Sequence, residues 1–294
     1  MKAALQTRPR AASAAADLAE LVKARLSLLT LATAMAGFAL GVKDSWNWLL
    51  LAAALGGTAL CAGGAAALNQ WWEREHDGLM KRTRQRPLPA GRMTSSDALV
   101  AGSVLSVSGV LCLALFANLL SASLAAATII FYILVYTPLK RVTSLNTIIG
   151  AVPGALPPLI GWTAARGSID AEGLTLFAIL FLWQMPHFLA IAWLYREDYA
   201  QAGFKMLSEG DESGAVTGRQ AVIYSLALLV VSLLPSVFFA YSAVYFYGAL
   251  VLGVGFTALA GRFAAQGTVP AAKALFLGSI AYLPLLLGLM VLAR

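Results

Sequence analysis

The 294-residue chain is 60% hydrophobic and only 12% charged, whereas a soluble domain carries about 25% charged residues. This composition excludes a disordered protein and a disulfide-stapled secreted protein, and it disfavours a water-soluble enzyme, whose surface needs more charge. The net charge of +7 does not predict a nucleic-acid partner, because basic residues also accumulate in the cytoplasmic loops of membrane proteins. We expect an all-α, polytopic membrane protein that has the lipid bilayer as a partner and binds no nucleic acid.

Nine stretches are apolar over about 20 residues, the length that a helix needs to cross the hydrocarbon core. They run roughly over 26–42, 48–68, 97–117, 120–138, 145–165, 173–194, 220–240, 243–261 and 271–292. The stretches are continuously apolar, which excludes the alternating strands of a membrane barrel. We expect about nine transmembrane helices around a central cavity, forming one domain over 26–294 after an N-terminal cytoplasmic tail of residues 1–25.

The basic residues predict the orientation of these helices. If the N-terminus is cytoplasmic, only Lys43, Arg166 and Arg294 of the 21 Lys and Arg residues fall on the opposite side of the membrane. Such an imbalance follows the positive-inside rule. Two long charged segments, 69–96 and 195–219, follow the second and sixth spans on the cytoplasmic side. We therefore expect any chemistry that faces water to lie at this end of the molecule.

The first charged segment carries an acidic stripe. Asn69, Glu73 and Asp77 are four residues apart, and each step of four turns a helix by about 400°, so the three share one face. Two carboxylates and an amide are suitable ligands for Mg²⁺, a hard cation that often shares phosphate oxygens with a substrate. The alternative is a set of solvated acids at the membrane boundary.

Basic residues follow the acidic stripe at once, at Lys81, Arg82, Arg84 and Arg86. Arginine can hold phosphate oxygens with two hydrogen bonds, and lysine supplies a point charge. The bases alone are equally compatible with contacts to anionic lipid. Acids for a metal beside bases for an oxyanion favour a diphosphate site.

The fourth and sixth spans also end in polar residues. Tyr136, Lys140 and Arg141 close the fourth span, a pattern that is common at membrane boundaries. Gln184 and His187 lie three residues apart in the otherwise apolar sixth span, so they share a face. Polar groups in such helices usually face the interior of the bundle. They are candidates for contact with a substrate, although hydrogen bonding within the bundle explains a lone histidine equally well.

A second charged segment follows the sixth span and contains Tyr195, Arg196, Glu197 and Asp198. It follows span six in the same way as the first charged segment follows span two. This placement suggests two similar helical halves whose acidic ends meet over one cavity. A solvated helix end is the alternative interpretation, above all for Glu197.

Three segments resemble the UbiA-type intramembrane prenyltransferases. Residues 69–77 read Asn-x3-Glu-x3-Asp and residues 82–89 read Arg-Thr-x-x-Arg-Pro-Leu-Pro, which is similar to the first acidic motif of that family. Residues 136–141 resemble its Tyr-x3-Lys-Arg element. Residues 183–187, Trp-Gln-Met-Pro-His, resemble a segment of the branch that uses haem, the protohaem IX farnesyltransferases.

The chain departs from the family pattern at two places. Glu73 stands where the middle acid is usually Asp, which affects the geometry of the site more than its function. Tyr195 and Tyr199 stand where the broad family has the aspartates of a second motif, so a second complete Mg²⁺ site is not expected. The haem branch has a similar Arg-x-Asp-Tyr pattern, and Asp198 is the carboxylate that it favours here.

The resemblance implies transfer of a farnesyl group from farnesyl diphosphate to a vinyl group of protohaem IX (haem b), which gives haem O and diphosphate for respiratory oxidases. Mg²⁺ is the implied cofactor, and haem is a substrate. The residue patterns and the resemblance together assign catalytic roles to Asn69, Glu73, Asp77, Lys140 and Asp198, and metal binding to Asn69, Glu73, Asp77 and Asp198. They assign substrate binding to Lys81, Arg82, Arg86, Tyr136, Arg141, Trp183, Gln184, His187, Tyr195 and Arg196.

The resemblance further implies a bacterial inner-membrane location, with the N-terminus and the active-site loops in the cytoplasm, and downstream partners that use haem O or convert it to haem A. His187 would contact the iron or a propionate of the haem. Two alternatives stay open. The first is a related prenyltransferase with a quinone-precursor or chlorophyllide acceptor, against which residues 183–187 argue. The second is a transporter, which is disfavoured because the charges cluster at one face rather than at the midplane.

Overall fold

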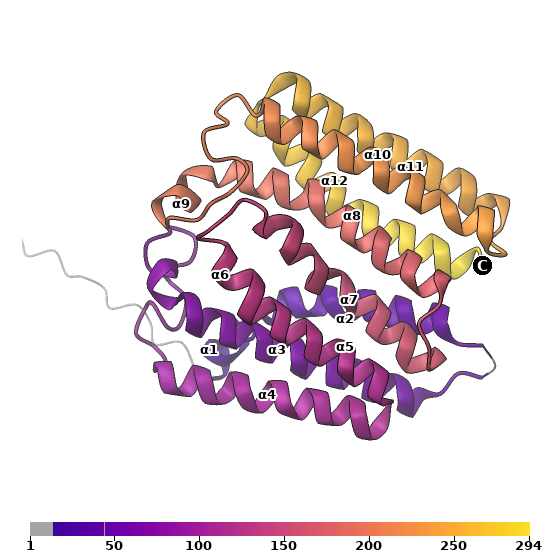
Figure 1. Ribbon diagram of the computed structural model, residues 1–294, viewed down its shortest axis with the longest axis horizontal. Helices are drawn as coiled ribbons and strands as arrows, with labels where there is room; N and C mark the ends of the chain where they lie inside the picture. The colour runs from indigo at the N-terminus through magenta and orange to yellow at the C-terminus, as the bar shows by residue number, and fades with distance from the viewer. Residues whose placement is uncertain (1–13, 44) are drawn as a thin grey trace, which may run out of the picture.

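The computed structural model describes residues 14–43 and 45–294, and this part of the chain forms helices and turns with no β-strand (Figure 1). The predicted all-α fold is confirmed. The helices are α1 (Ala14–Leu21), α2 (Ala24–Gly41), α3 (Trp48–Asp77), α4 (Ser95–Phe116), α5 (Leu119–Ile130), the π-helix η1 (Phe131–Tyr136), α6 (Thr137–Leu139), α7 (Asn146–Arg166), α8 (Ala171–Leu194), α9 (Arg196–Gln201), α10 (Ala215–Phe238), α11 (Ala243–Gln266) and α12 (Val269–Leu292).

The chain is an integral membrane protein. Within the described residues, eight spans are long and apolar enough to cross a membrane, or up to nine if α1 and α2, which meet at a bend of 53°, count as one. The predicted number of about nine agrees with this range. The main difference lies in α3, which continues to Asp77 instead of ending near residue 68. Its polar last turns stay helical because they are buried against other segments.

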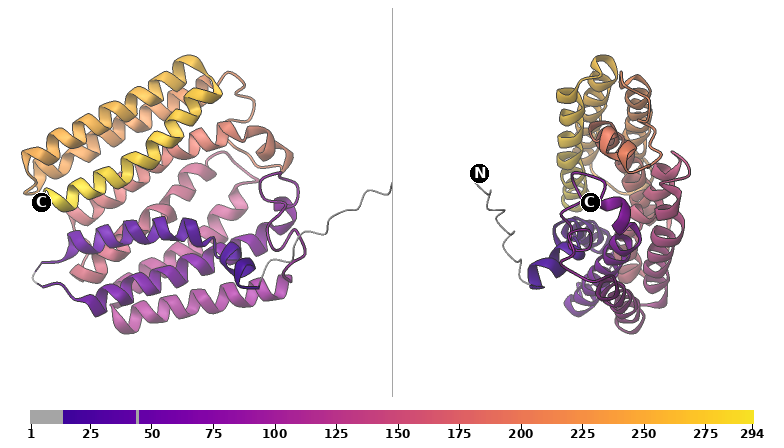
Figure 2. Two further views of the ribbon diagram at one scale, coloured as in Figure 1. Left: turned by 180° about the vertical axis from the view of Figure 1, so that it is seen from behind. Right: turned by 90° about the vertical axis from the view of Figure 1, so that its left-hand side faces the viewer.

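The helices run along a common direction and pack in two groups, with α2 to α5 on one side and α10 to α12 on the other (Figures 1 and 2). Between them, α7 packs on α2, and α8 packs on α10 and α12. Small residues allow the close approach of α2 and α7: a side-chain carbon on Gly37 would meet the Pro158 carbonyl, and one on Gly161 would meet the Ala34 carbonyl. Close backbone packing at small residues is typical of membrane helices.

The fourth span is one continuous helix made of α5, η1 and α6. Its π-helical turn, Phe131–Tyr136, is stabilised by the Thr137 hydroxyl, which donates to the Tyr132 carbonyl at 2.8 Å. Such turns are rare and are found frequently at functional sites. This one lies at the end of the span, next to Lys140, and includes Tyr136.

The ends of three spans meet at one end of the bundle. The Lys205 amide, after α9, donates to the Lys140 carbonyl at 2.7 Å, and the Asn146 side chain donates to the Lys205 carbonyl at 2.6 Å. The turns that follow α3 lie at the same end (Figure 1). The two long charged segments and the end of the fourth span are therefore neighbours.

The N-terminal helix α1 closes this end of the bundle against α3. Gln70 donates to the Leu21 carbonyl at 2.7 Å, and Arg92 binds Asp17 at 2.7 Å and Glu20 at 2.6 Å. Residues 1–13 of the predicted N-terminal tail lie outside the described residues. The segment 14–21 is helical and is anchored to the following turns.

Candidate active site

The acidic stripe lies on one side of α3 and lines a cavity of about 150 Å³. Asn69, Glu73 and Asp77 are 1%, 6% and 1% exposed. The Asn69 amide donates to Glu73 Oε2 at 2.9 Å and to the Thr137 hydroxyl at 3.3 Å. Buried carboxylates are destabilising unless they are paired or bind a cation, so Glu73 and Asp77 require positively charged groups nearby.

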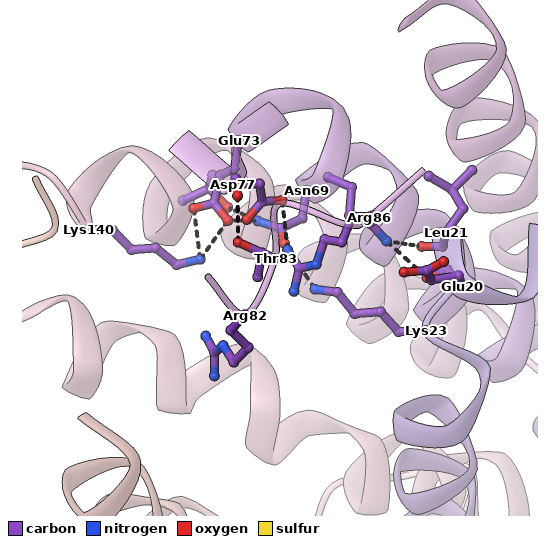
Figure 3. A network of polar contacts seen from close by, with 12 residues as sticks. Glu20, Leu21, Lys23, Asn69, Glu73, Asp77, Arg82, Thr83, Arg86 and Lys140 are labelled. Atoms are coloured by element: carbon purple, nitrogen blue, oxygen red, sulfur yellow. Dashed lines mark hydrogen bonds and ion pairs between the residues drawn. The ribbon is translucent and has the colours of Figure 1, made fainter. Parts of the chain in front are cut away.

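Two cations pair directly with the carboxylates (Figure 3). Lys140 Nζ lies 2.8 and 3.0 Å from the two oxygens of Glu73, and Arg86 Nη1 lies 2.7 Å from Asp77 Oδ2. Although burial opposes it, the Glu73 carboxylate raises the pKa of Lys140, so this ammonium stays charged. The Thr83 hydroxyl donates to the Asp77 carbonyl at 2.8 Å and fixes the turn that carries Arg86.

Two further cations reach the cavity without a carboxylate partner in the described part of the chain. Lys23, in the turn between α1 and α2, donates to Asn69 Oδ1 at 3.1 Å. Arg82 donates to the Tyr199 hydroxyl at 3.1 Å, and its guanidinium lies 5.1 Å from the centre of the Tyr195 ring. Arg82 thus joins the first charged segment to the second.

The charge balance of the cavity favours an anion. Its lining contains the carboxylates of Glu73 and Asp77 and the four cations Lys23, Arg82, Arg86 and Lys140. Positive charge exceeds negative charge around the two buried carboxylates, and an added anion would offset this excess. A diphosphate has the charge and the oxygen acceptors that such a set of donors can bind.

The stripe can also hold a divalent cation. Asp77 Oδ1 is buried and has no hydrogen-bond partner, an arrangement that is costly without a ligand. Over residues 14–43 and 45–294, no three His, Cys, Asp or Glu side chains gather at one point. A metal would therefore be held by Asp77, Glu73 and the Asn69 oxygen together with substrate phosphate, as Mg²⁺ usually is. The oxygens of these three residues, completed by substrate phosphate, therefore fit Mg²⁺.

Some predicted site residues lie outside the cavity. Its lining does not contain Lys81, Arg141, Tyr195, Arg196 or Asp198. Arg196 is instead placed over the Trp193 ring at 4.5 Å and donates to the Trp193 carbonyl at 3.0 Å. Asp198 is half-buried on α9. The roles assigned to these five residues stay predictions, as do those of the residues that line the cavity.

The polar residues of α8 form a separate group, away from the acidic stripe. His187 Nδ1 lies 2.7 Å from the Ser279 hydroxyl of α12, and the Trp183 indole donates to the Ser279 carbonyl at 2.8 Å. The Trp183 and His187 rings are stacked 5.1 Å apart. Gln184 donates to the Ala151 carbonyl of α7 at 3.3 Å. All three side chains of α8 therefore face other helices, as expected for polar groups in a membrane bundle.

Sequence reasoning missed several residues of the cavity. Lys23 was interpreted only as an orientation signal, yet it touches the stripe. Aromatic residues of the lining, Tyr132, Tyr199 and Phe204, were not expected there. The presence of Tyr132 in the lining could have been predicted, because it lies four residues before Tyr136. That of Phe204 could not, because only the turn after α9 brings it to the cavity. Phe204 also stacks on His76 at 5.9 Å.

Comparison with known proteins agrees with this fold. The UbiA prenyltransferase family matches residues 30–289. A protoheme IX farnesyltransferase from Solibacter usitatus is 46% identical over 287 residues, which cover 95% of this chain and 98% of the relative.

Among solved structures, a digeranylgeranylglyceryl phosphate synthase has a TM-score of 0.80 at 15% identity, covering 95% of this chain and 98% of that one. A UbiA homologue from Archaeoglobus fulgidus bound to GPP and Mg²⁺ has a TM-score of 0.70 at 13% identity, covering 93% of this chain and 99% of that one. At these identities the structures support the fold alone, whereas the sequence matches extend over nearly the whole chain. The chain belongs to the UbiA prenyltransferase family.

Proposed function

We propose that this protein is an intramembrane prenyltransferase that joins the farnesyl group of farnesyl diphosphate to a vinyl group of haem b. The observation that carries the proposal is the cavity at the end of α3, where two buried carboxylates stand among four cations. The choice of haem as acceptor rests on the naming of the relative at 46% identity and on residues 183–187. The position of the charges at one end of the bundle supports an enzyme over a transporter.

The cavity residues would act on the diphosphate. Arg82, Arg86 and Lys140 hold its oxygens and stabilise the negative charge that develops as its bond to farnesyl C1 breaks. Mg²⁺, held by Asp77, Glu73 and Asn69, would supply further charge neutralisation. The rings of Tyr132 and Tyr136 line the same cavity, where aromatic faces can stabilise a cation-like C1.

The steps on the haem consume one water molecule. A haem vinyl group attacks farnesyl C1, and water adds to the resulting cation with loss of a proton. The products are a hydroxyethylfarnesyl haem, which is haem O, and diphosphate.

We further propose a bacterial inner-membrane location with this cavity on the cytoplasmic side, where the basic segments lie. Asp198 is proposed as an additional acid that approaches the substrates from α9. His187, with Trp183 and Gln184, is proposed to contact the haem. Proteins that use haem O or convert it to haem A would take the product.

A product assay tests the proposal. Purified protein in lipid is given farnesyl diphosphate, Mg²⁺ and either haem b or 4-hydroxybenzoate, and the products are separated by reversed-phase chromatography. We expect a more hydrophobic haem, whose formation stops when the metal is chelated. Prenylation of 4-hydroxybenzoate without any change to the haem would replace our proposal with a quinone-directed activity.

A further inference from the structure

Lys23 stands out among the cavity cations because it binds the amide of the stripe rather than a carboxylate. Lys140 is paired with Glu73, and Arg86 with Asp77, whereas Lys23 Nζ donates to Asn69 Oδ1 at 3.1 Å. In Figure 3, Lys23 and Lys140 reach the stripe from opposite sides. The Lys23 ammonium therefore occupies an oxygen that a metal ion would need.

The orientation of the Asn69 amide is determined by its neighbours. Its nitrogen donates to Glu73 Oε2 at 2.9 Å and to the Thr137 hydroxyl at 3.3 Å. The reverse orientation would place the amide oxygen against a carboxylate and its nitrogen against an ammonium, and neither pair can form a hydrogen bond. The Asn69 oxygen thus faces Lys23 and is the cation-binding atom of this side chain.

The backbone of Lys23 is held in an uncommon conformation. Its φ of 49° makes it the one residue other than glycine with a positive φ in the described ranges 14–43 and 45–294. The helix before it is fixed to α3 and the following turns, since Gln70 binds the Leu21 carbonyl and Arg92 binds Asp17. A non-glycine residue in this region is usually maintained by its surroundings and is often found at functional sites. The bend between α1 and α2 places the Lys23 side chain over the stripe.

We propose that Lys23 is a displaceable counter-cation: in the free enzyme it occupies Asn69 Oδ1, and it turns to the diphosphate when the metal–diphosphate pair binds. The proposal rests on the proposed function, because it requires Mg²⁺ and diphosphate in this cavity. An ammonium and a divalent cation cannot share one oxygen without strong repulsion. The flexible four-carbon side chain of lysine can move between the two ligands. Lys23 would thus weaken the binding of metal alone and strengthen the binding of metal with diphosphate.

Two binding titrations on the purified full chain test this coupling. Mn²⁺ is titrated alone and followed by electron paramagnetic resonance, and inorganic pyrophosphate is titrated calorimetrically in the presence of Mg²⁺. We expect Lys23→Met to bind Mn²⁺ alone several-fold more tightly and to bind Mg²⁺–pyrophosphate about 10- to 100-fold more weakly, as the loss of one charged hydrogen bond predicts. Lys23→Gly, which suits the positive φ, should give the same two opposite shifts.

Lys273→Met is the matched control, because it removes the same charge from an exposed position on α12. It should change neither affinity. Parallel weakening of both ligands in the Lys23 variants, or no change in either, would overturn the role of Lys23 while the proposed function stands. If the unsubstituted protein binds neither Mn²⁺ nor Mg²⁺–pyrophosphate, the proposed function and this inference both fail.

Discussion

At the scale of single residues, the site depends on how each carboxylate is partnered. Glu73 has both oxygens bound to Lys140, whereas Asp77 has one oxygen on Arg86 and the other buried without a partner. An unpartnered carboxylate oxygen in a buried position is destabilising for the protein alone. Asp77 is therefore the residue of the stripe that gains most from a bound metal.

The first prediction concerns Asp77→Asn. The amide has nearly the same shape as the carboxylate but lacks the negative charge that would hold the metal. We therefore expect the rate of haem farnesylation to fall by about 100- to 1000-fold, which is the usual effect of removing one group that stabilises charge in the transition state. Product formation is measured by chromatography. Size-exclusion elution in detergent should match the unsubstituted protein. A rate within twofold of the unsubstituted protein would remove Asp77 from the proposed site.

The second prediction concerns His187. This side chain lies apart from the acidic stripe, bonded to Ser279 and stacked on Trp183. We expect His187→Ala to weaken haem binding at least about tenfold, the effect of losing one hydrogen bond or ligand in a buried site. The affinity for Mg²⁺–pyrophosphate should not change. Haem binding is read from its absorption spectrum.

Asp77→Asn serves as the reciprocal control for His187→Ala, because it should weaken pyrophosphate binding and leave haem binding intact. Equal losses of both ligands in the His187 variant would contradict its assignment to haem.

At the scale of helices, much of the architecture follows from the sequence. Apolar length predicts the spans, and the spacing of Asn69, Glu73 and Asp77 predicts a shared face, because both depend on local helix geometry. The π-helical turn at Phe131–Tyr136 and the bend at Lys23 were not predictable. The bend depends on a contact between distant segments, Gln70 with Leu21, which a local pattern does not contain.

The third prediction concerns the packing of α2 on α7. A methyl group on Gly161 would meet the Ala34 backbone carbonyl, which cannot rotate away as a side chain can. We expect Gly161→Ala to destabilise the fold by about 1–3 kcal/mol, the usual cost of overpacking. The midpoint of thermal unfolding in detergent measures the effect.

Gly255→Ala on α11 is the matched control, because a side-chain carbon there would meet no atom within 4 Å. It should unfold at the same temperature as the unsubstituted protein or slightly above it, since alanine favours helices. Equal midpoints for both alanine variants would show that α2 and α7 do not depend on close contact at Gly161.

At the scale of the whole molecule, the few charged residues are divided between the two ends of the bundle. The cavity and its four cations lie at one end, and the C-terminus lies at the other (Figure 2). At this second end Arg294 and Arg166 both contact Glu172, at 3.1 and 3.8 Å. Lys43 follows α2 at this second end. The predicted separation of basic residues therefore matches the two ends of the fold. The apolar helices between them provide the environment that a farnesyl chain requires.

An experimental structure of the protein with Mn²⁺ and a non-hydrolysable farnesyl diphosphate analogue would locate the metal and the diphosphate directly. We expect anomalous scattering from Mn²⁺ beside Asp77, diphosphate oxygens in contact with Arg82, Arg86 and Lys140, and Lys23 moved from Asn69 to the diphosphate. A diphosphate bound elsewhere, with Lys140 still paired to Glu73 and no metal beside Asp77, would contradict the proposed active site.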